Sequence, residues 1–186
     1  EDCRRQRQMC IRDRYRGFGV SACATCDGFF FKEKTVAVVG GGNAAVEEAM
    51  FLTKFASKVK LIHRRNELRA EKMLQKKLME NKKIEIIWDT VIEDVIGDKD
   101  PKNVTGIKIK NVKSNKIDEL KVDGLFIAIG HDPATNLFKD QVNMDKEGYL
   151  ITKPDSTETN IPGVFAAGDV KAVSYTHLRA HETSPH

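Results

Sequence analysis

The chain has 186 residues, a formal net charge of +4 and a mean hydropathy of −0.43. This length supports one complete hydrophobic core and part of a second. No apolar run is long enough to span a bilayer, so we expect no membrane segment. Five arginines lie in the first fourteen residues, and without them the chain is close to neutral, which argues against nucleic-acid binding.

Both ends of the chain have the character of added segments. Residues 9–13 (Met-Cys-Ile-Arg-Asp) and 173–177 (Val-Ser-Tyr-Thr-His) can be encoded by complementary DNA strands. The sequences that flank them resemble the two arms of a transposase adapter used in sequencing libraries. We therefore expect residues 1–14 and 172–186 to be adapter-like, disordered segments, and we leave them out of the fold prediction.

The first motif in the remaining chain is a Cys-x-x-Cys pair, Cys23 and Cys26, followed directly by Asp27. With Cys3 and Cys10 in the excluded segment, these are the only two thiols. Zinc needs four ligands, so we expect no metal site. Two thiols at this spacing can alternate between dithiol and disulfide, which predicts redox chemistry in a reducing compartment such as the cytoplasm.

The next segments predict a strand, a glycine turn, a helix and a second strand. Thr35–Val39 is a short apolar, β-branched run that ends in three glycines, as a buried parallel strand does. From Asn43, which can cap the helix, apolar residues recur at helical spacing up to Ala56. Val59–Ile62 is a second buried strand, so these elements form a βαβ unit.

The rest of the chain predicts more α/β structure. The expected elements are a helix over about Ala70–Met79 and strands over Ile84–Trp88, Ile107–Lys110, Leu120–Val122, Leu125–Gly130 and Val164–Asp169, the last ending in a Gly-Asp turn. The alternation of Ile107–Lys110 predicts a half-exposed strand in an antiparallel meander. Polar turns are expected at Gly97–Asn103 and Lys113–Lys116.

The glycine turn has the Gly-x-Gly-x-x-Ala spacing of a dinucleotide site. Glycines let the backbone approach a pyrophosphate, and the helix N-terminus supplies free N–H groups and a positive dipole. Such turns also occur without a ligand, but here a strand precedes and a helix follows. The residues that we expect to contact the cofactor are Gly40, Gly41, Gly42, Asn43, Ala44 and Ala45.

The residues after the second strand indicate which dinucleotide binds. An NAD site places an acid there to bind the ribose 2′-hydroxyl. This chain has His63, Arg64 and Arg65 instead, with Arg69 one helical turn further on. Guanidinium groups bind a 2′-phosphate with charge-assisted, bidentate hydrogen bonds. The alternative is a solvated basic loop; the position favours NADPH over NADH.

Four motifs together resemble the low-molecular-weight thioredoxin reductases. They are Cys23-Ala24-Thr25-Cys26-Asp27-Gly28-Phe29-Phe30, Gly40-Gly41-Gly42-Asn43, His63-Arg64-Arg65, and the stretch from Thr159 to Asp169. The resemblance covers residues 15–171. It implies a homodimeric cytoplasmic enzyme with two Rossmann-type domains, one for NADPH and one for FAD, that passes electrons to thioredoxin.

The resemblance also implies roles for particular residues. Cys23 and Cys26 would be the redox pair, with Cys26 nearer the flavin, and Asp27 would be the acid/base. Gly130, Gly168 and Asp169 are expected to contact a cofactor, the last two in the second FAD motif. Ala44 departs from the pattern, because many relatives carry Ser or Thr there, so a hydroxyl contact to the cofactor is absent.

The resemblance divides the chain into an NADPH-binding domain over residues 15–130, which carries the cysteine pair, and a partial FAD-binding domain over 131–171. Since the first FAD motif is missing, we expect this chain to bind NADPH at best. Two alternatives stay open. One is a related flavoprotein, either peroxiredoxin-reducing or ferredoxin-linked, which should lack the 63–65 cluster. The other is a non-catalytic nucleotide-binding fragment.

Overall fold

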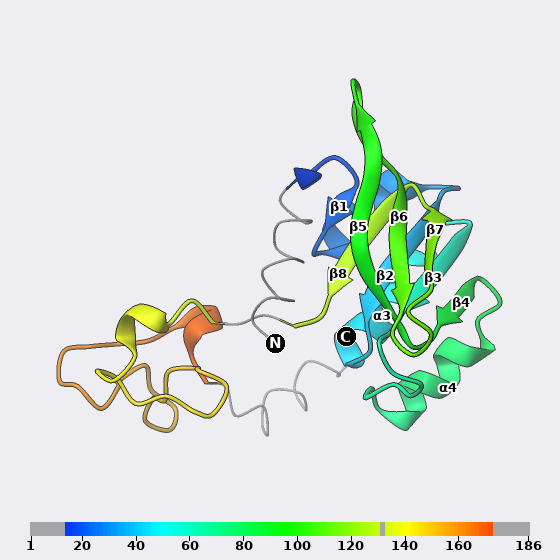
Figure 1. Ribbon diagram of the computed structural model, residues 1–186. Coiled ribbons are helices and arrows are strands. Elements are labelled where there is room, and N and C mark those ends of the chain that lie inside the picture. The colour runs from blue at the N-terminus through cyan, green and yellow to red at the C-terminus, as the bar shows by residue number, and fades with distance from the viewer. Residues whose placement is uncertain (1–13, 131–132, 173–186) are drawn as a thin grey trace. The chain divides into compact units, whose positions relative to one another are not determined.

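The computed structural model describes residues 14–130 and 133–172 of the chain (Figure 1). The chain divides into two compact units, unit 1 over Glu1–Gly130 and unit 2 over His131–His186, each described by itself. Of the adapter-like end segments, all but Arg14 and Ala172 lie outside the described residues. No helix among the described residues is long and apolar enough to cross a membrane.

A five-stranded parallel sheet forms the centre of unit 1, in the order β1-β8-β2-β3-β4. Its strands are β1 (Val20–Ser21), β2 (Thr35–Gly40), β3 (Lys58–Ile62), β4 (Ile84–Ile87) and β8 (Gly124–Ala128). In β2, every residue after Thr35 is buried. A continuous apolar run of this kind fits a central parallel strand that is covered on both faces.

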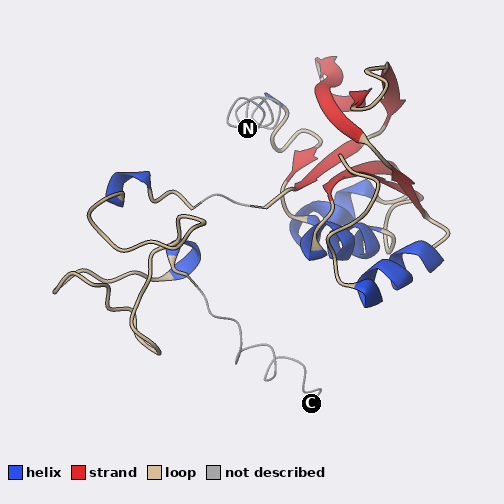
Figure 2. Ribbon diagram, turned by 60° about the horizontal axis from the view of Figure 1, so that its bottom comes forward, coloured by secondary structure: helices blue, strands red, loops and turns tan. Residues whose placement is uncertain are grey.

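Helices cover one face of this sheet (Figures 1 and 2). They are α2 (Ala24–Asp27), the 3₁₀ turn η1 (Gly28–Phe31), α3 (Asn43–Leu52) and α4 (Lys72–Glu80). Val36 and Val38 of β2 belong to the same buried cluster as Ala45, Ala49 and Leu52 of α3. The helical spacing of these α3 residues therefore builds the core that positions the strand-to-helix turn.

A three-stranded antiparallel sheet packs on the opposite face of the parallel sheet. It consists of β5 (Thr90–Lys99), β6 (Lys102–Asn111) and β7 (Ile117–Lys121), with β6 in the middle. Ala37 and Val39, the alternate residues of β2, join Val95 and Ile107 in a second buried cluster. Unit 1 thus has three layers, and the predicted βαβ unit and antiparallel meander are confirmed.

Strands β1 and β5 were not predicted, and one predicted turn is longer than the turn in the structure. β1 has only two residues, and β5 contains two register shifts against β6, at Ile92/Asp94 and Ile96/Gly97. These irregularities break the two-residue alternation that identifies a strand. Because β5 and β6 continue to Lys99 and from Lys102, the expected turn over Gly97–Asn103 shrinks to two residues at its centre.

The strand predicted over Val164–Asp169 in unit 2 is wrong. Phe165 pairs with Glu158 in an isolated bridge, and Gly168–Val170 form the 3₁₀ turn η3. A strand needs a ladder partner along its length, and the described residues supply one only at this bridge. Unit 2 otherwise has a short 3₁₀ turn, η2 (Asn136–Phe138), and a small core. The buried residues of that core are Val142, Leu150 and Ala166.

One side chain of α3 is poorly matched to its surroundings. Glu48 is partly buried, and its Oε2 is a buried atom without a hydrogen-bond partner. Burial disfavours the charged carboxylate and raises the pKa of Glu48 from 4.5 to about 6. The folded state therefore holds this proton more tightly than the unfolded state, and the associated stability is lost as pH rises from 4.5 through about 6.

We predict that Glu48→Gln increases the free energy of unfolding at pH 7.5 by about 1 kcal/mol, a value reduced for solvent access. The gain should shrink as pH falls from 6 to 4.5, because the wild-type carboxyl is then neutral. Denaturant unfolding at several pH values measures this effect. Glu47→Gln, at an exposed neighbouring position, is the control; equal effects of the two substitutions would contradict the assignment.

Candidate functional site

The glycine turn between β2 and α3 is closely packed around Gly40 and Gly41 and open around Gly42. Gly40 has φ 154°, and a Cβ there would come within 2.6 Å of Ala45 Cβ and collide with the carbonyl oxygen of Ala128. A Cβ at Gly41 would overlap the imidazole of His63. At Gly42 a Cβ would meet nothing within 4 Å. The fold excludes side chains at Gly40 and Gly41, but not at Gly42.

Gly42 is the N-cap residue of α3, and it makes no side-chain cap for this ten-residue helix. The first N–H groups of an α-helix have no partner within the helix, and they carry the positive end of its dipole. Since the space above Gly42 is open, an anionic group can approach these N–H groups directly. The arrangement has the properties required of a pyrophosphate site.

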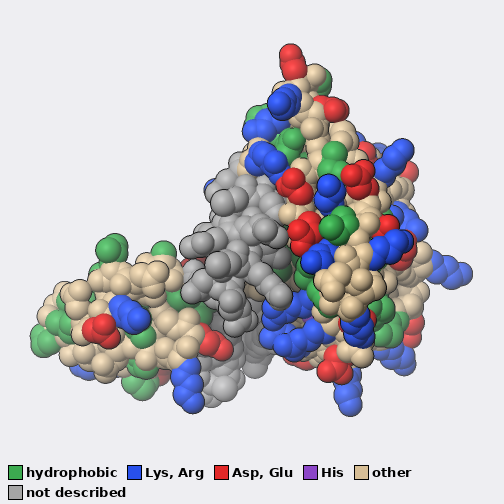
Figure 3. Space-filling view, viewed as in Figure 1, with side chains coloured by type: hydrophobic (Ala, Val, Ile, Leu, Met, Phe, Trp, Pro, Cys, Tyr) green, Lys and Arg blue, Asp and Glu red, His purple; other side chains and the backbone are tan. Residues whose placement is uncertain are grey.

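The segment after β3, residues 63–70, carries the predicted arginines and is hydrogen-bonded to the glycine turn; we call it the arginine segment. Arg64, Arg65 and Arg69 are exposed, and Lys and Arg side chains are frequent along the lower part of unit 1 in Figure 3. The carbonyl oxygen of Gly41 accepts hydrogen bonds from the backbone N–H groups of Arg69 (2.7 Å) and Ala70 (3.2 Å). The structure thus brings the glycine turn and the arginine segment together.

Asn43 does not cap its own helix, so that prediction is wrong. Its Oδ1 accepts a hydrogen bond from the backbone N–H of Glu71 at 2.8 Å, and its Nδ2 donates to Glu71 Oε1 at 3.1 Å. Glu71 is the N-cap residue of α4 and makes no cap with its own side chain. Asn43 therefore forms a second hydrogen-bonded link between the glycine turn and the end of the arginine segment.

His63 lies beneath the glycine turn, apart from the exposed arginines that follow it in sequence. The residue is 5% exposed. The centroids of its ring and of the Trp88 ring are 6.3 Å apart, in an edge-to-face arrangement. Its Nε2 is buried and has no hydrogen-bond partner. Burial lowers the pKa of His63 below 6.5, and the charges of Arg65 and Arg69 lower it further, against the opposing effect of two backbone carbonyls.

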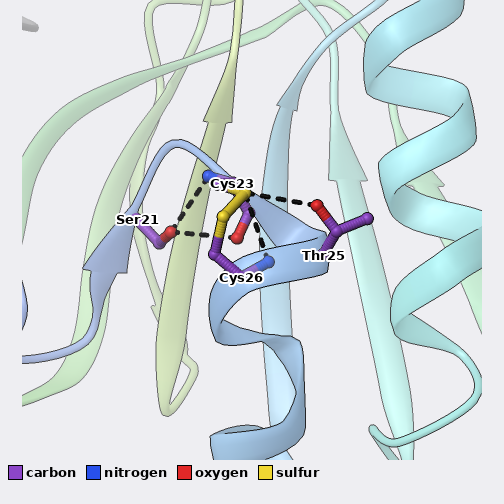
Figure 4. Close-up of a disulfide and its surroundings, with 4 residues drawn as sticks. All are labelled: Ser21, Cys23, Thr25 and Cys26. Atoms are coloured by element: carbon purple, nitrogen blue, oxygen red, sulfur yellow. Dashed lines mark hydrogen bonds between the residues drawn. A yellow bond between two sulfur atoms is a disulfide. The ribbon is translucent and has the colours of Figure 1, made fainter.

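Cys23 and Cys26 are joined in a disulfide at the start of α2 (Figure 4). Cys23 is half-buried and Cys26 is exposed. Cys23 Sγ accepts a hydrogen bond from the backbone N–H of Cys26 at 3.2 Å. Asp27 is half-buried and is the last residue of α2. Cys26 is therefore the more accessible residue of the pair.

Two hydroxyl residues beside the disulfide were not predicted. Ser21 Oγ accepts a hydrogen bond from the Cys23 backbone N–H at 3.0 Å and lies 3.3 Å from the Cys23 carbonyl oxygen. The Thr25 hydroxyl lies 3.3 Å from Cys23 Sγ. Serine and threonine commonly bond to backbone groups two residues away, so a hydroxyl residue two positions from a reactive cysteine is the signal that could have identified Ser21.

The remaining predicted residues are two glycines, an aspartate and two alanines, all exposed except Ala45. Gly130 (φ 93°) and Gly168 (φ 76°) have left-handed backbones, and a Cβ at either would meet nothing within 4 Å. Gly168 and Asp169 begin η3 in unit 2. Ala44 is exposed and Ala45 buried in α3. Open space at Gly130 and Gly168 is compatible with a ligand, as at Gly42, but neither position lies at the N-terminus of an α-helix.

Comparison with known proteins identifies the family of this chain. The model of the pyridine nucleotide-disulphide oxidoreductases matches residues 6–184. The chain belongs to this family. It is 60% identical over 163 residues to thioredoxin reductase from Coxiella burnetii, a match that covers 84% of the chain and 50% of the relative. It is 56% identical over 162 residues to thioredoxin reductase from Rickettsia conorii, covering 87% and 52%.

The structural comparison confirms the predicted α/β fold. The crystal structure of Lactococcus lactis thioredoxin reductase matches with a TM-score of 0.76 and 41% identity, over 88% of this chain and 53% of that one. The oxidoreductase chain therefore spans about half the length of the relatives that it matches. The predicted resemblance is confirmed at the level of the family.

Gly42→Ala should separate nucleotide binding from folding in this chain. Because Gly42 has extended backbone angles (φ −91°, ψ −176°) and open space around it, we expect only the loss of N-cap quality, at most about 1 kcal/mol of unfolding free energy, but at least about tenfold weaker dinucleotide binding. Gly41→Ala is the contrasting variant, and overlap with His63 should destabilise it by about 1–3 kcal/mol. Calorimetric titration and denaturant unfolding measure the two effects; normal binding by Gly42→Ala would contradict the site.

The environment of His63 predicts its titration in the same chain. Its folded pKa is lowered, so the unfolded state binds the proton more readily, and the associated stability is present above pH 6.5 and lost as pH falls below it. We expect one imidazole resonance, missing from the NMR spectrum of His63→Gln, to titrate below pH 6.5. A resonance that titrates at or above pH 6.5 would show that the ring is not buried in neutral form.

Proposed function

We propose that this chain is the NADPH-binding half of a thioredoxin-disulfide reductase that transfers electrons from NADPH, through FAD, to thioredoxin. One observation carries the proposal: a single compact unit holds both a Cys-x-x-Cys disulfide and a glycine turn tied to an arginine segment. The first feature is a two-electron acceptor, and the second is suited to a phosphorylated dinucleotide. The names of the similar proteins support the same function.

The residues of unit 1 fit NADPH. The pyrophosphate would lie above Gly42, at the N-terminus of α3, where the backbone is open. Arg64, Arg65 and Arg69 would hold the 2′-phosphate, for which planar guanidinium groups are well suited. The buried ring of His63 would support the turn by packing against Gly41, where it leaves no room for a side chain.

The cysteine pair would carry the disulfide chemistry. NADPH and FAD, when bound, would supply two electrons, and the Cys23–Cys26 disulfide would take these up with two protons to become a dithiol. One cysteine, as thiolate, then attacks the thioredoxin disulfide, and the other resolves the mixed disulfide, so that thioredoxin leaves as a dithiol. Asp27, next to Cys26 in sequence, is the proposed proton donor and acceptor.

The remaining assignments complete the proposal. Residues 15–130 form the NADPH-binding domain, and residues 131–171 form part of an FAD-binding domain, to which Gly168 and Asp169 contribute. We assign the complete protein as a homodimer, and we assign it to the cytoplasm because a catalytic dithiol needs a reducing compartment. The chain covers about half of its relatives, so we expect it to bind NADPH without holding FAD by itself.

The complete protein should bind FAD and oxidise NADPH when oxidised thioredoxin is supplied. Cys26→Ser should abolish thioredoxin reduction while leaving the bleaching of the flavin by NADPH intact, because the disulfide acts after the flavin. Thr25→Ala, between the two cysteines, is the control and should keep most of the activity. Spectrophotometric turnover assays measure all three proteins. Thioredoxin reduction by Cys26→Ser would refute the proposed mechanism.

A further inference from the structure

The arginine segment is held at both ends by the glycine turn and its surroundings. At its start, the backbone N–H of His63 donates to the carbonyl oxygen of Ile87 at 3.0 Å, and the His63 ring lies under Gly41. At its end, the Gly41 carbonyl oxygen accepts from Arg69 and Ala70. Between these points Arg64 to Glu67 are exposed, while Leu68 is buried and the Arg65 carbonyl oxygen accepts a hydrogen bond from the Asp89 backbone N–H at 3.2 Å. The ties at the end of the segment therefore contribute to the placement of the arginines, most directly of Arg69.

Asn43 supplies the last of these ties, through the two hydrogen bonds of its amide to Glu71. It is the first residue of α3, directly after the open position at Gly42. Its side chain does not bond to the N–H groups of its own helix. It satisfies the backbone N–H of the α4 N-cap instead, so one side chain links the N-terminal ends of both helices.

We propose that Asn43 is a positioning residue for dinucleotide selectivity: it holds the segment that carries Arg64, Arg65 and Arg69 in register with the glycine turn. This inference rests on the proposed preference for NADPH. The effect is indirect, since Asn43 acts through Glu71 and the backbone between the arginines and α4. It concerns the 2′-phosphate, which NADPH has and NADH lacks.

The physical reason is the cost of ordering the arginines. Within residues 14–130 and 133–172, none of the three guanidinium groups makes an ion pair. Their placement therefore depends on the backbone that carries them. If that backbone moves, binding must fix both the backbone and the long side chains, and this entropy loss weakens recognition of the 2′-phosphate. NADH binding does not use the arginines and does not carry this cost.

The test compares the Kd values of NADPH and NADH for the 186-residue chain. Trp88 is the one tryptophan of the sequence, and its ring lies 6.3 Å from that of His63, so its emission reports binding. Asn43→Ala should reduce the preference for NADPH at least about fivefold. Glu71→Gln keeps an acceptor oxygen for the Asn43 amide and should keep the wild-type preference.

If Asn43→Ala does not fold, a swapped pair, in which the carboxylate and the amide exchange positions 43 and 71, provides the test. Asn43→Asp removes the donor and opposes two carboxylates, so the preference should fall. Combining Asn43→Asp with Glu71→Gln returns a donor and an acceptor in exchanged positions, and the preference should rise again. In an Arg64→Ala, Arg65→Ala background, Asn43→Ala should change the remaining preference less than about twofold, because it acts through the arginines.

The outcomes separate this inference from the proposed function. If wild-type chain binds NADPH and NADH equally, the NADPH preference itself is wrong. If wild-type chain prefers NADPH but Asn43→Ala weakens both nucleotides by the same factor, the preference stands, and Asn43 acts on the shared pyrophosphate instead of on selectivity. Failure of the swapped pair to restore the preference would also overturn the positioning role.

Discussion

The arrangement of unit 1 depends on one close approach, the packing of backbone and imidazole beneath the glycine turn. Gly40 lies against the carbonyl oxygen of Ala128, and Gly41 lies against His63. With no side chains in between, β2 can pass directly into α3, and the carbonyl oxygen of Gly41 can reach the N–H groups of Arg69 and Ala70. The same packing therefore shapes the turn and anchors the arginine segment.

This constraint gives a buried histidine and three exposed arginines different tasks, although they are neighbours in sequence. His63 supports the turn from inside and is kept neutral by burial. Arg64, Arg65 and Arg69 remain on the surface, where charge costs little. From the sequence, all four residues were predicted to form one cluster. The direction of each side chain depends on how β3 ends, and residue type alone does not reveal it.

Much of the fold could be predicted because its signals are local. The apolar run of β2, the glycine turn and the helical spacing of α3 each report their own conformation, and all three elements were predicted, although α3 ends at Leu52 and does not continue to Ala56. β5 was missed because its bulges interrupt the alternation near Asp94 and Gly97. The tie from Asn43 to Glu71 was missed for another reason: a capping residue can bond to its own helix or to a neighbour, and only the packing decides.

The open space over Gly42 has a consequence for how such a site persists. Any glycine codon becomes an alanine codon by a single base change. At Gly40 and Gly41 that change would damage the fold, so the chain's own stability guards those positions. At Gly42 the backbone is extended and the methyl group would meet nothing. Folding would resist this change only through the poorer N-cap that alanine makes. The stronger requirement for glycine would come from outside the chain, from the pyrophosphate that we propose to lie over it.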